Sequence, residues 1–345
     1  MNSSSTTKLS RLPVLDGWRG ISILCVLAGH MLPLGPKGFQ LNATVATAGM
    51  SLFFILSGFL IISMLSRNAN VLSFIVRRVF RIIPLAWAYI IVVFLIHGAD
   101  FNQWKTTLLF YANLPPIYLI PGLTGHFWSL CVEMQFYAAI ALIVALAGQR
   151  GLLIVPIVAL SVTTARIISG EHTSIITWFR IDEILAGGSL ALALSSSKIT
   201  RLLDGLPSFL PFLTVPLLLI SCHPEFGAAN YARPYLAALL IGSTILRSED
   251  RFQRVLCGRV LGYLAHVSYA LYVIHECTDF GWMGQGNVFV RYTKRLGSFI
   301  LSFSFAHIST NYYEKYWLDL GHRIAARIEG RPLSRQSAAV IVTKQ

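Results

Sequence analysis

Charged residues are scarce in this sequence. Asp, Glu, Lys and Arg make up 12% of the 345 residues, whereas a soluble domain carries about 25%. Only 15 residues are acidic, and 55% are hydrophobic. A composition so poor in charge excludes a soluble globular enzyme and a disordered chain.

Paired cysteines are also lacking. The five cysteines form no C-x-x-C pair, and Cys25 and Cys131 lie inside apolar runs. We interpret all five as packing residues rather than redox centres or ligands. We therefore expect no bound metal.

Long apolar stretches are what the sequence has in abundance. Each is long enough to cross ~30 Å of hydrocarbon at ~1.5 Å per residue in a helix. The sequence therefore predicts an all-α fold, a polytopic transmembrane helical bundle of about ten spans. These predicted spans cover about 15–32, 47–65, 81–98, 127–147, 152–169, 176–195, 207–222, 233–247, 258–276 and 296–316.

Two apolar segments need a separate interpretation. The segment 107–120 holds Asn113, Pro115 and Pro116, so we expect an interfacial or re-entrant piece rather than a span. The run from Val14 to Leu32 resembles a secretory signal but lacks an A-x-A cleavage site. We expect it to be retained as a helix.

The net charge of +13 would suggest nucleic acid as a partner for a soluble chain. In a membrane protein, Lys and Arg instead set the topology by staying in the cytoplasm. With ten crossings and a cytoplasmic N-terminus, about 19 of the 28 basic residues lie inside and about 6 outside. We predict a multi-pass protein with both termini cytoplasmic, a membrane domain over 1–320, a cytoplasmic basic tail over 321–345, and no nucleic-acid partner.

Ionisable residues inside membrane spans are costly, so each is a candidate functional residue. In LDGWRGISILCVLAGH, Arg19 and His30 are separated by about three helical turns and share one face. Asp16 is placed to pair with Arg19. The alternative is that His30 is an interior histidine with its hydrogen bonds satisfied, and that Arg19 is a topology anchor.

A second candidate is the basic group Arg77, Arg78 and Arg81 in SFIVRRVFRIIP. These side chains project together where a helix enters the bilayer, and guanidinium groups suit phosphate. The alternative is an anchor that touches anionic lipid headgroups.

Further polar side chains fall in the later spans. In HFWSLCVEMQFY, four residues at helical spacing, the last of them Tyr137, line one stripe, and in WFRIDEILAGG two residues can pair beside Asp182. SYALYVIHE places a histidine before Glu276, and ISTNYYEKYW carries a late glutamate. The residues in question are His126, Ser129, Glu133, Arg180, Glu183, His275 and Glu314.

Several of these blocks, taken in order, resemble the integral-membrane acyltransferase family 3. The blocks are LDGWRG with Arg19 and His30, FFILSGFL, RRVFRIIP, HFWSLCVEMQFY, FRIDEILAG and SYALYVIH, over about residues 12–316. That family includes O-antigen, exopolysaccharide and nodulation-factor acetylases and macrolide acyltransferases. Members often have a Glu followed by a basic or aromatic residue and then Pro near the last span, whereas Lys315 and Tyr316 follow Glu314 here. The role of Glu314 therefore stays open. Some members add an SGNH-type hydrolase domain, which we do not expect in these 345 residues.

The resemblance implies an O-acyltransferase of the bacterial inner membrane. It would move an acyl group, most simply acetyl, from cytoplasmic acyl-CoA to a hydroxyl of a cell-surface or secreted carbohydrate. Acyl-CoA (acetyl-CoA), a carbohydrate acceptor and membrane lipids are the expected partners, with no metal.

The family motifs and the chemistry of the side chains together predict a role for each candidate residue. His30 would act as general base, Glu133 would orient it, and Arg19 would polarise or steer the donor. Arg77, Arg78 and Arg81 would hold the CoA phosphates. Acceptor binding is assigned to Trp128, Ser129, His126, Arg180, Glu183 and His275.

Other functions remain open from the residues alone. A lipid or a macrolide-type small molecule could be the acceptor, and an acyl-His30 intermediate could replace direct transfer. A proton-coupled transporter or flippase would also place His, Glu and Arg inside the bundle.

Overall fold

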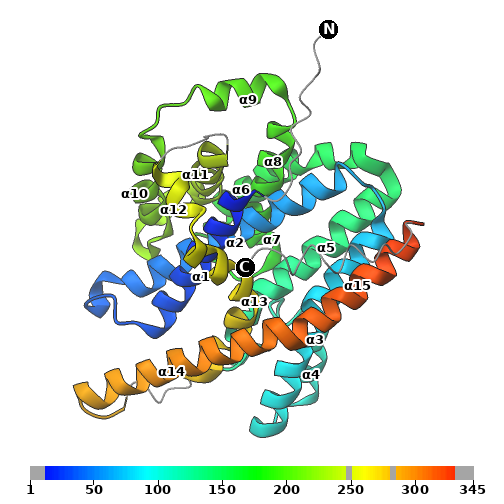
Figure 1. The fold of residues 1–345 in the computed structure, drawn as a ribbon. Helices are drawn as coiled ribbons and strands as arrows, with labels where there is room; N and C mark the ends of the chain where they lie inside the picture. The colour runs from blue at the N-terminus through cyan, green and yellow to red at the C-terminus, as the bar shows by residue number, and fades with distance from the viewer. Residues whose placement is uncertain (1–11, 246–250, 280–284, 331–345) are drawn as a thin grey trace.

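The structure is a computed structural model that describes residues 12–245, 251–279 and 285–330. Helices dominate these ranges and no strand occurs in them, which confirms the predicted all-α class (Figure 1). The α-helices are α1 (Pro13–Met31), α2 (Leu41–Leu65), α3 (Val71–His97), α4 (Phe101–Leu108), α5 (Trp128–Ala147), α6 (Val155–Ser169), α7 (Thr177–Arg180), α8 (Asp182–Leu194), α9 (Ser197–Asp204), α10 (Leu210–Cys222), α11 (Arg233–Ile245), α12 (Arg251–Leu256), α13 (Arg259–Asp279), α14 (Val288–Ile308) and α15 (Lys315–Ile328).

Three helical stretches of the described ranges are both long and apolar enough to cross a membrane. They are Lys37–Leu65, Val71–His97 and Gly125–Ser169, the last of which contains both α5 and α6. Some helices at the other predicted spans are shorter, as α8 and α11 are with 13 residues each. The number of ten crossings therefore stays a prediction.

Several helices extend beyond the predicted spans. The third predicted span begins at 81, but α3 begins at Val71, where the side chain of Asn70 caps it by accepting from the backbone N–H of Ser73 at 2.9 Å. Arg77 and Arg78 therefore lie within α3 and not in the loop before it. The segment 109–124 is made of turns, in line with its predicted lack of a span.

Small residues allow the central helices to approach closely. A Cβ on Gly58 of α2 would lie 1.8 Å from the carbonyl oxygen of Ile184 in α8, and one on Gly187 would lie 2.1 Å from that of Ile55. Gly20 of α1 meets the carbonyl of Leu261 in α13 in the same way, at 2.6 Å. Such contacts are typical of helix packing in membranes. They hold α1 against α13 and bring the C-terminal ends of these two helices together.

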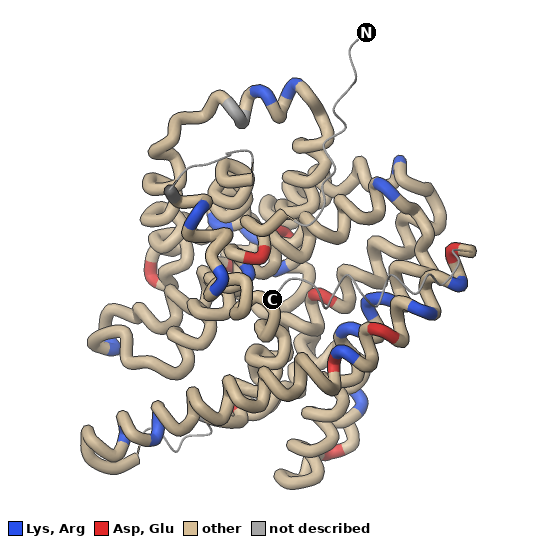
Figure 2. The backbone as a smooth tube through the Cα atoms, viewed as in Figure 1, with Lys and Arg blue, Asp and Glu red and all other residues tan. Residues whose placement is uncertain are grey.

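The last helices form a long rod along one side of the molecule. A π-helical turn, Ser309–Glu314, joins α14 to α15, and the rod runs from orange to red in Figure 1. The part formed by α15 packs on α3, where Gly321 meets the side chain of Phe80. Charged side chains gather along these two helices, whereas α2 carries none (Figure 2).

The helix α15 runs across the predicted domain boundary at residue 320. Residues 321–328 belong to this helix, which packs on α3, and the division into a membrane domain and a tail stays a prediction. Residues 331–345, and residues 1–11 at the other terminus, lie outside the described residues, so the predicted location of both termini stays a prediction.

Candidate active site

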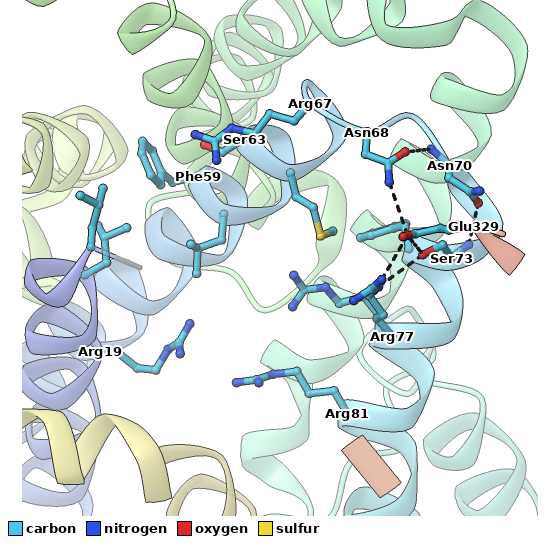
Figure 3. A pocket seen from close by; sticks show the side chains of 16 residues that line it. Arg19, Phe59, Ser63, Arg67, Asn68, Asn70, Ser73, Arg77, Arg81 and Glu329 are labelled. Carbon is cyan, nitrogen blue, oxygen red and sulfur yellow. Dashed lines mark hydrogen bonds and ion pairs between the residues drawn. The ribbon is translucent and has the colours of Figure 1, made fainter. Parts of the chain in front are cut away.

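A basic cavity of about 540 Å³ opens between α1, α2, α3 and the end of α15. Its lining includes the five guanidinium groups of Arg19, Arg67, Arg77, Arg78 and Arg81 (Figure 3). The sequence predicted that the three arginines of α3 converge, and all three line this one cavity. Such a concentration of positive charge suits a ligand with several phosphates.

One of these arginines is already paired within the protein. Nη2 of Arg77 lies 3.1 Å from Oε1 of Glu329, just beyond the end of α15. The same carboxylate accepts hydrogen bonds from the hydroxyl of Ser73 and from Nδ2 of Asn68, the latter at 3.4 Å (Figure 3). Glu329 thus places a negative charge at the edge of a basic cavity, which sequence spacing did not indicate.

A narrower cavity of about 50 Å³ continues from the basic one. The two share Arg19, Leu60, Arg78 and Arg81 in their linings, and the narrow one extends to Tyr272. Because Arg19 lies near the start of α1 and His30 near its end, this passage runs beside α1 toward the histidine.

The carboxylate of Glu133 faces this narrow cavity. Its Oε1 accepts a hydrogen bond from Ser57 Oγ at 2.5 Å and another from the hydroxyl of Tyr137. Among the described residues, Glu276 is the acid within ion-pair distance of His30. The structure thus pairs Glu133 with Ser57 and Tyr137, and His30 with Glu276, so the predicted role of Glu133 in orienting His30 stays a prediction.

A cluster of three histidines and one carboxylate lies at the far end of α1. Nδ1 of His30 is 3.9 Å from Oε1 of Glu276, and Nδ1 of His126 is 3.1 Å from Oε2 of the same carboxylate. The ring of His275 is 5.0 Å from that of His30 and 5.0 Å from that of His126, centroid to centroid. The structure thus brings His30, His126 and His275 together from α1, from the turn before α5 and from α13.

The side chain of His30 is 37% exposed, whereas His126 and His275 are buried. A base must reach both solvent and a reacting group, so His30 is the member of the cluster that a substrate can approach. Tyr272 joins the cluster to the narrow cavity, because it lines that cavity and its ring lies 5.6 Å from the ring of His275.

Ser129 belongs to the wall of this site. Its hydroxyl lies 2.5 Å from that of Tyr272, and the Tyr272 hydroxyl donates to the carbonyl of His126. The predicted stripe of His126 and Ser129 is therefore part of one hydrogen-bonded group that fixes the position of Tyr272.

Trp128 and Arg180 line a separate cavity of about 390 Å³, together with residues 173–176. The Arg180 guanidinium carbon lies 5.2 Å from the centre of the Trp128 ring, and Arg180 is buried. The sequence predicted both as acceptor-binding residues. The structure brings them to one cavity, which presents an aromatic ring and a positive charge.

Glu183 instead belongs to a buried ion-pair network. The predicted pair with Arg180 is present at 3.5 Å, but Arg233 approaches the same Oε1 more closely, at 2.5 Å. Beside it, Asp182 pairs with Arg166 at 2.5 Å. Glu183, Arg233 and Arg166 have no exposed surface, so Glu183 is engaged by the protein and does not line the cavity that Arg180 shares with Trp128.

Glu314, whose role the sequence left open, lies in the π-helical turn. Its Oε1 accepts hydrogen bonds from Thr310 at 2.8 Å and from Ser309 at 3.3 Å. The carboxylate is buried and bound to its own turn, so its contacts are those of a residue that shapes the junction of α14 and α15.

A family model described as "Acyltransferase domain" matches residues 12–310. The chain belongs to this acyltransferase family. The match confirms the resemblance that the sequence blocks indicated.

Individual relatives agree with this assignment. Peptidoglycan O-acetyltransferase OatA of Listeria monocytogenes is 27% identical over 157 residues, which cover 38% of this chain and 24% of OatA. A protein of Staphylococcus aureus with the name "Putative O-acetyltransferase" is 24% identical over 315 residues, 78% of this chain and 50% of that protein. The chain thus spans at most half the length of these two relatives. An uncharacterized protein of Haemophilus influenzae is 29% identical over 212 residues, 50% of this chain and 85% of that protein. No solved structure matches the chain.

Three residues of the site were missed as functional candidates or misplaced by the sequence analysis. Glu276 was visible beside His275 in SYALYVIHE but received no role. Arg233 stands at the first position of the predicted span 233–247 and received no role, whereas it is fully buried against Glu183. Glu329 fell in the predicted tail, and its contact with Arg77 joins residues 252 positions apart, which no local pattern can indicate.

Proposed function

We propose that this protein is a membrane O-acetyltransferase that moves an acetyl group from cytoplasmic acetyl-CoA to a hydroxyl of a cell-surface or secreted carbohydrate. The observation that supports it best is the pair of adjoining cavities, which share Arg19, Leu60, Arg78 and Arg81. They offer a route from a phosphate-binding cavity to the histidine cluster.

The donor would enter the basic cavity with its phosphates. Arg78 and Arg81, together with Arg19, supply charge-assisted hydrogen bonds to the 3′-phosphate and the pyrophosphate. The pantetheine arm would follow the narrow cavity past Arg19, so that the thioester lies below Tyr272. Widening of this cavity would accompany donor binding, because about 50 Å³ is less than the arm occupies.

The reaction would take place at His30. The acceptor hydroxyl attacks the thioester carbonyl while His30 takes the hydroxyl proton, so a C–O bond forms as the C–S bond breaks. The sulfur leaves as a thiolate and receives that proton, which yields the ester and free CoA. Arg19 would steer the donor arm, and Glu276, the acid within 4 Å of His30, would hold the ring in place.

The acceptor would approach from the end of α1 where His30 is exposed. The cavity of Trp128 and Arg180 supplies an aromatic surface for a sugar ring and a cation for a polar substituent. The names of the two O-acetyltransferase relatives support a hydroxyl acceptor, and the name of OatA supports a carbohydrate. The basic cavity would face the cytoplasm of a bacterial inner membrane, consistent with the positive-inside rule.

A direct assay tests this function. Purified protein in detergent is given acetyl-CoA and candidate glycans, and release of the CoA thiol is followed together with the mass of the glycan. We expect thiol release that depends on a glycan, with a gain of one acetyl mass. Glycans from cells with and without the protein should differ by the same mass. Transport of a substrate into vesicles without any acetyl gain would instead support the transporter.

A further inference from the structure

The histidine cluster has the composition and spacing of a transition-metal site. One nitrogen each of His30 and His275 and one oxygen of Glu276 lie within 4.8 Å of one another. Two histidines and a carboxylate form a common ligand set for Zn²⁺ and similar ions. They come from two helices, α1 and α13, that pack side by side (Figure 1).

His275 presents a lone pair to this cluster. Its Nδ1 lies 2.7 Å from the carbonyl oxygen of Tyr272, an acceptor, so Nδ1 carries the proton and Nε2 does not. Nε2 is buried and has no hydrogen-bond partner among the residues that the structure describes. A buried nitrogen acceptor left without a donor is costly, and a bound cation would satisfy it.

The remaining contacts resemble the supporting shell of a metal site. Metal-binding histidines usually donate their second N–H to a carbonyl, as His275 does to Tyr272. Ligating carboxylates are usually supported by a neighbouring polar group, and Oε2 of Glu276 lies within ion-pair distance, 3.1 Å, of Nδ1 of His126. The other nitrogen of His126 lies 3.1 Å from the carbonyl of Val273. Both nitrogens of His126 thus face oxygens, which makes it a supporting residue.

We propose that His30, His275 and Glu276 bind a divalent transition-metal ion such as Zn²⁺, and that the ion competes with the acetyl acceptor for His30. Metal–ligand distances of ~2.0–2.2 Å require the three side chains to move together by about 1 Å. The side chain of His30 is 37% exposed, which leaves a path by which an ion can enter.

The competition between the ion and the acceptor rests on the proposed role of His30 as base, whereas the metal site itself rests on the geometry alone. Acetyl transfer would proceed without the ion and stop when it binds.

Zinc binding to the whole purified protein tests the site. Protein treated with EDTA and dialysed is titrated with Zn²⁺ in the absence of acetyl-CoA. We expect one ion per chain for the wild type. His275→Asn and Glu276→Gln should each weaken binding by roughly 100-fold or more, and His126→Asn by about 10- to 100-fold, as is typical for a lost supporting residue.

His266→Asn is the matched control, because His266 is an exposed histidine on the same helix α13 and should leave zinc binding unchanged. Retained CoA binding at the other end of α1 shows that each variant is folded. Equal zinc binding by the wild type and the double variant His275→Asn, Glu276→Gln would overturn the site.

Zinc inhibition tests the competition separately. Acetyl transfer by the wild type and by His266→Asn should fall as the site fills, with a midpoint at the measured zinc affinity, and EDTA should restore it. Stoichiometric zinc that leaves transfer unchanged would overturn the assignment of His30 as a ligand. A protein that binds zinc but transfers no acetyl group would support the site and contradict the proposed function.

Discussion

Glu329 and Arg77 form an ion pair, with 3.1 Å between Oε1 and Nη2, that joins the end of α15 to the wall of the basic cavity. The carboxylate occupies the guanidinium group that a donor phosphate would otherwise bind. Ser73 and Asn68 bind the same oxygen and hold the carboxylate in place. Arg77 lines the cavity but is paired with this carboxylate, so Arg78, Arg81 and Arg19 are the arginines that we expect to bind the donor.

Removal of this charge should strengthen donor binding. In Glu329→Gln, Arg77 loses its ion pair and becomes available for a charge-assisted hydrogen bond to a phosphate. The change also removes the repulsion between the Glu329 carboxylate and that phosphate. We expect CoA to bind roughly 10-fold more tightly, as measured by calorimetry. Asp319→Asn is the control, because Asp319 lies in α15, the helix that Glu329 follows, but does not line the cavity. Equal CoA affinity in the two variants would show that Glu329 does not restrain Arg77.

Loss of the other arginines should have the opposite effect. Arg78→Gln together with Arg81→Gln should weaken CoA binding by about 10-fold or more for each lost phosphate contact. The deficit should shrink when dephospho-CoA or a pantetheine donor is used. Arg201→Gln, an exposed arginine of α9, controls for net charge. If the double variant binds CoA as the wild type does, the arginines serve topology alone.

The buried network should be needed for folding rather than for donor recognition. Glu183 is fully buried and pairs with Arg233 and Arg180. Arg233→Met removes the closer of these two partners and leaves Arg180. Removal of one partner of a buried ion pair costs about 3–5 kcal/mol. We expect a clearly lower melting temperature in detergent, with Lys198→Met on α9 as the surface control. A melting temperature equal to that of the wild type would mean that water or Arg180 compensates for the loss.

Local contacts were the part of the site that sequence could predict. Arg180 and Glu183 pair across one helical turn as their spacing indicated, and Arg77, Arg78 and Arg81 line one cavity because they share a face of α3. Helical periodicity fixes such neighbours within a helix such as α3, and it also holds across the single residue between α7 and α8.

Long-range partners could not be predicted in this way. Glu133 and Glu276 are both carboxylates in apolar helices, and periodicity gives no reason to prefer one as the neighbour of His30. The choice follows from the close approach of α1 and α13 at Gly20 and Leu261, a property of helix packing and not of spacing. The partner of Arg233 depends on packing in the same way.

Two native cysteines offer a test of the topology. Cys257 lies just before α13 and Cys277 near its end, and both are exposed. If both termini are cytoplasmic, an impermeant maleimide added to spheroplasts should label Cys277 and spare Cys257 until the membrane is opened. Cys257→Ser and Cys277→Ser identify which thiol reacts. Labelling of Cys257 from outside would invert the predicted orientation.

The proposed chemistry depends most sharply on His30. Gln at this position keeps much of the size and hydrogen-bonding capacity of the ring but cannot take a proton. His30→Gln should therefore bind acetyl-CoA normally, because Arg78 and Arg81 line the basic cavity near the opposite end of α1. Acetyl transfer should fall by about 10²- to 10⁴-fold, the usual loss with a general base.

His266→Gln is the matched control for this change, since His266 is exposed and lies outside the cluster. Transfer and CoA binding are measured on the same preparations, so that folding is judged independently of catalysis. A His30→Gln protein that acetylates glycans at the wild-type rate would make the histidine structural. One that has lost acetyl-CoA binding would move His30 into the donor site, because a base acts on the acceptor hydroxyl and contributes nothing to the affinity for the phosphates.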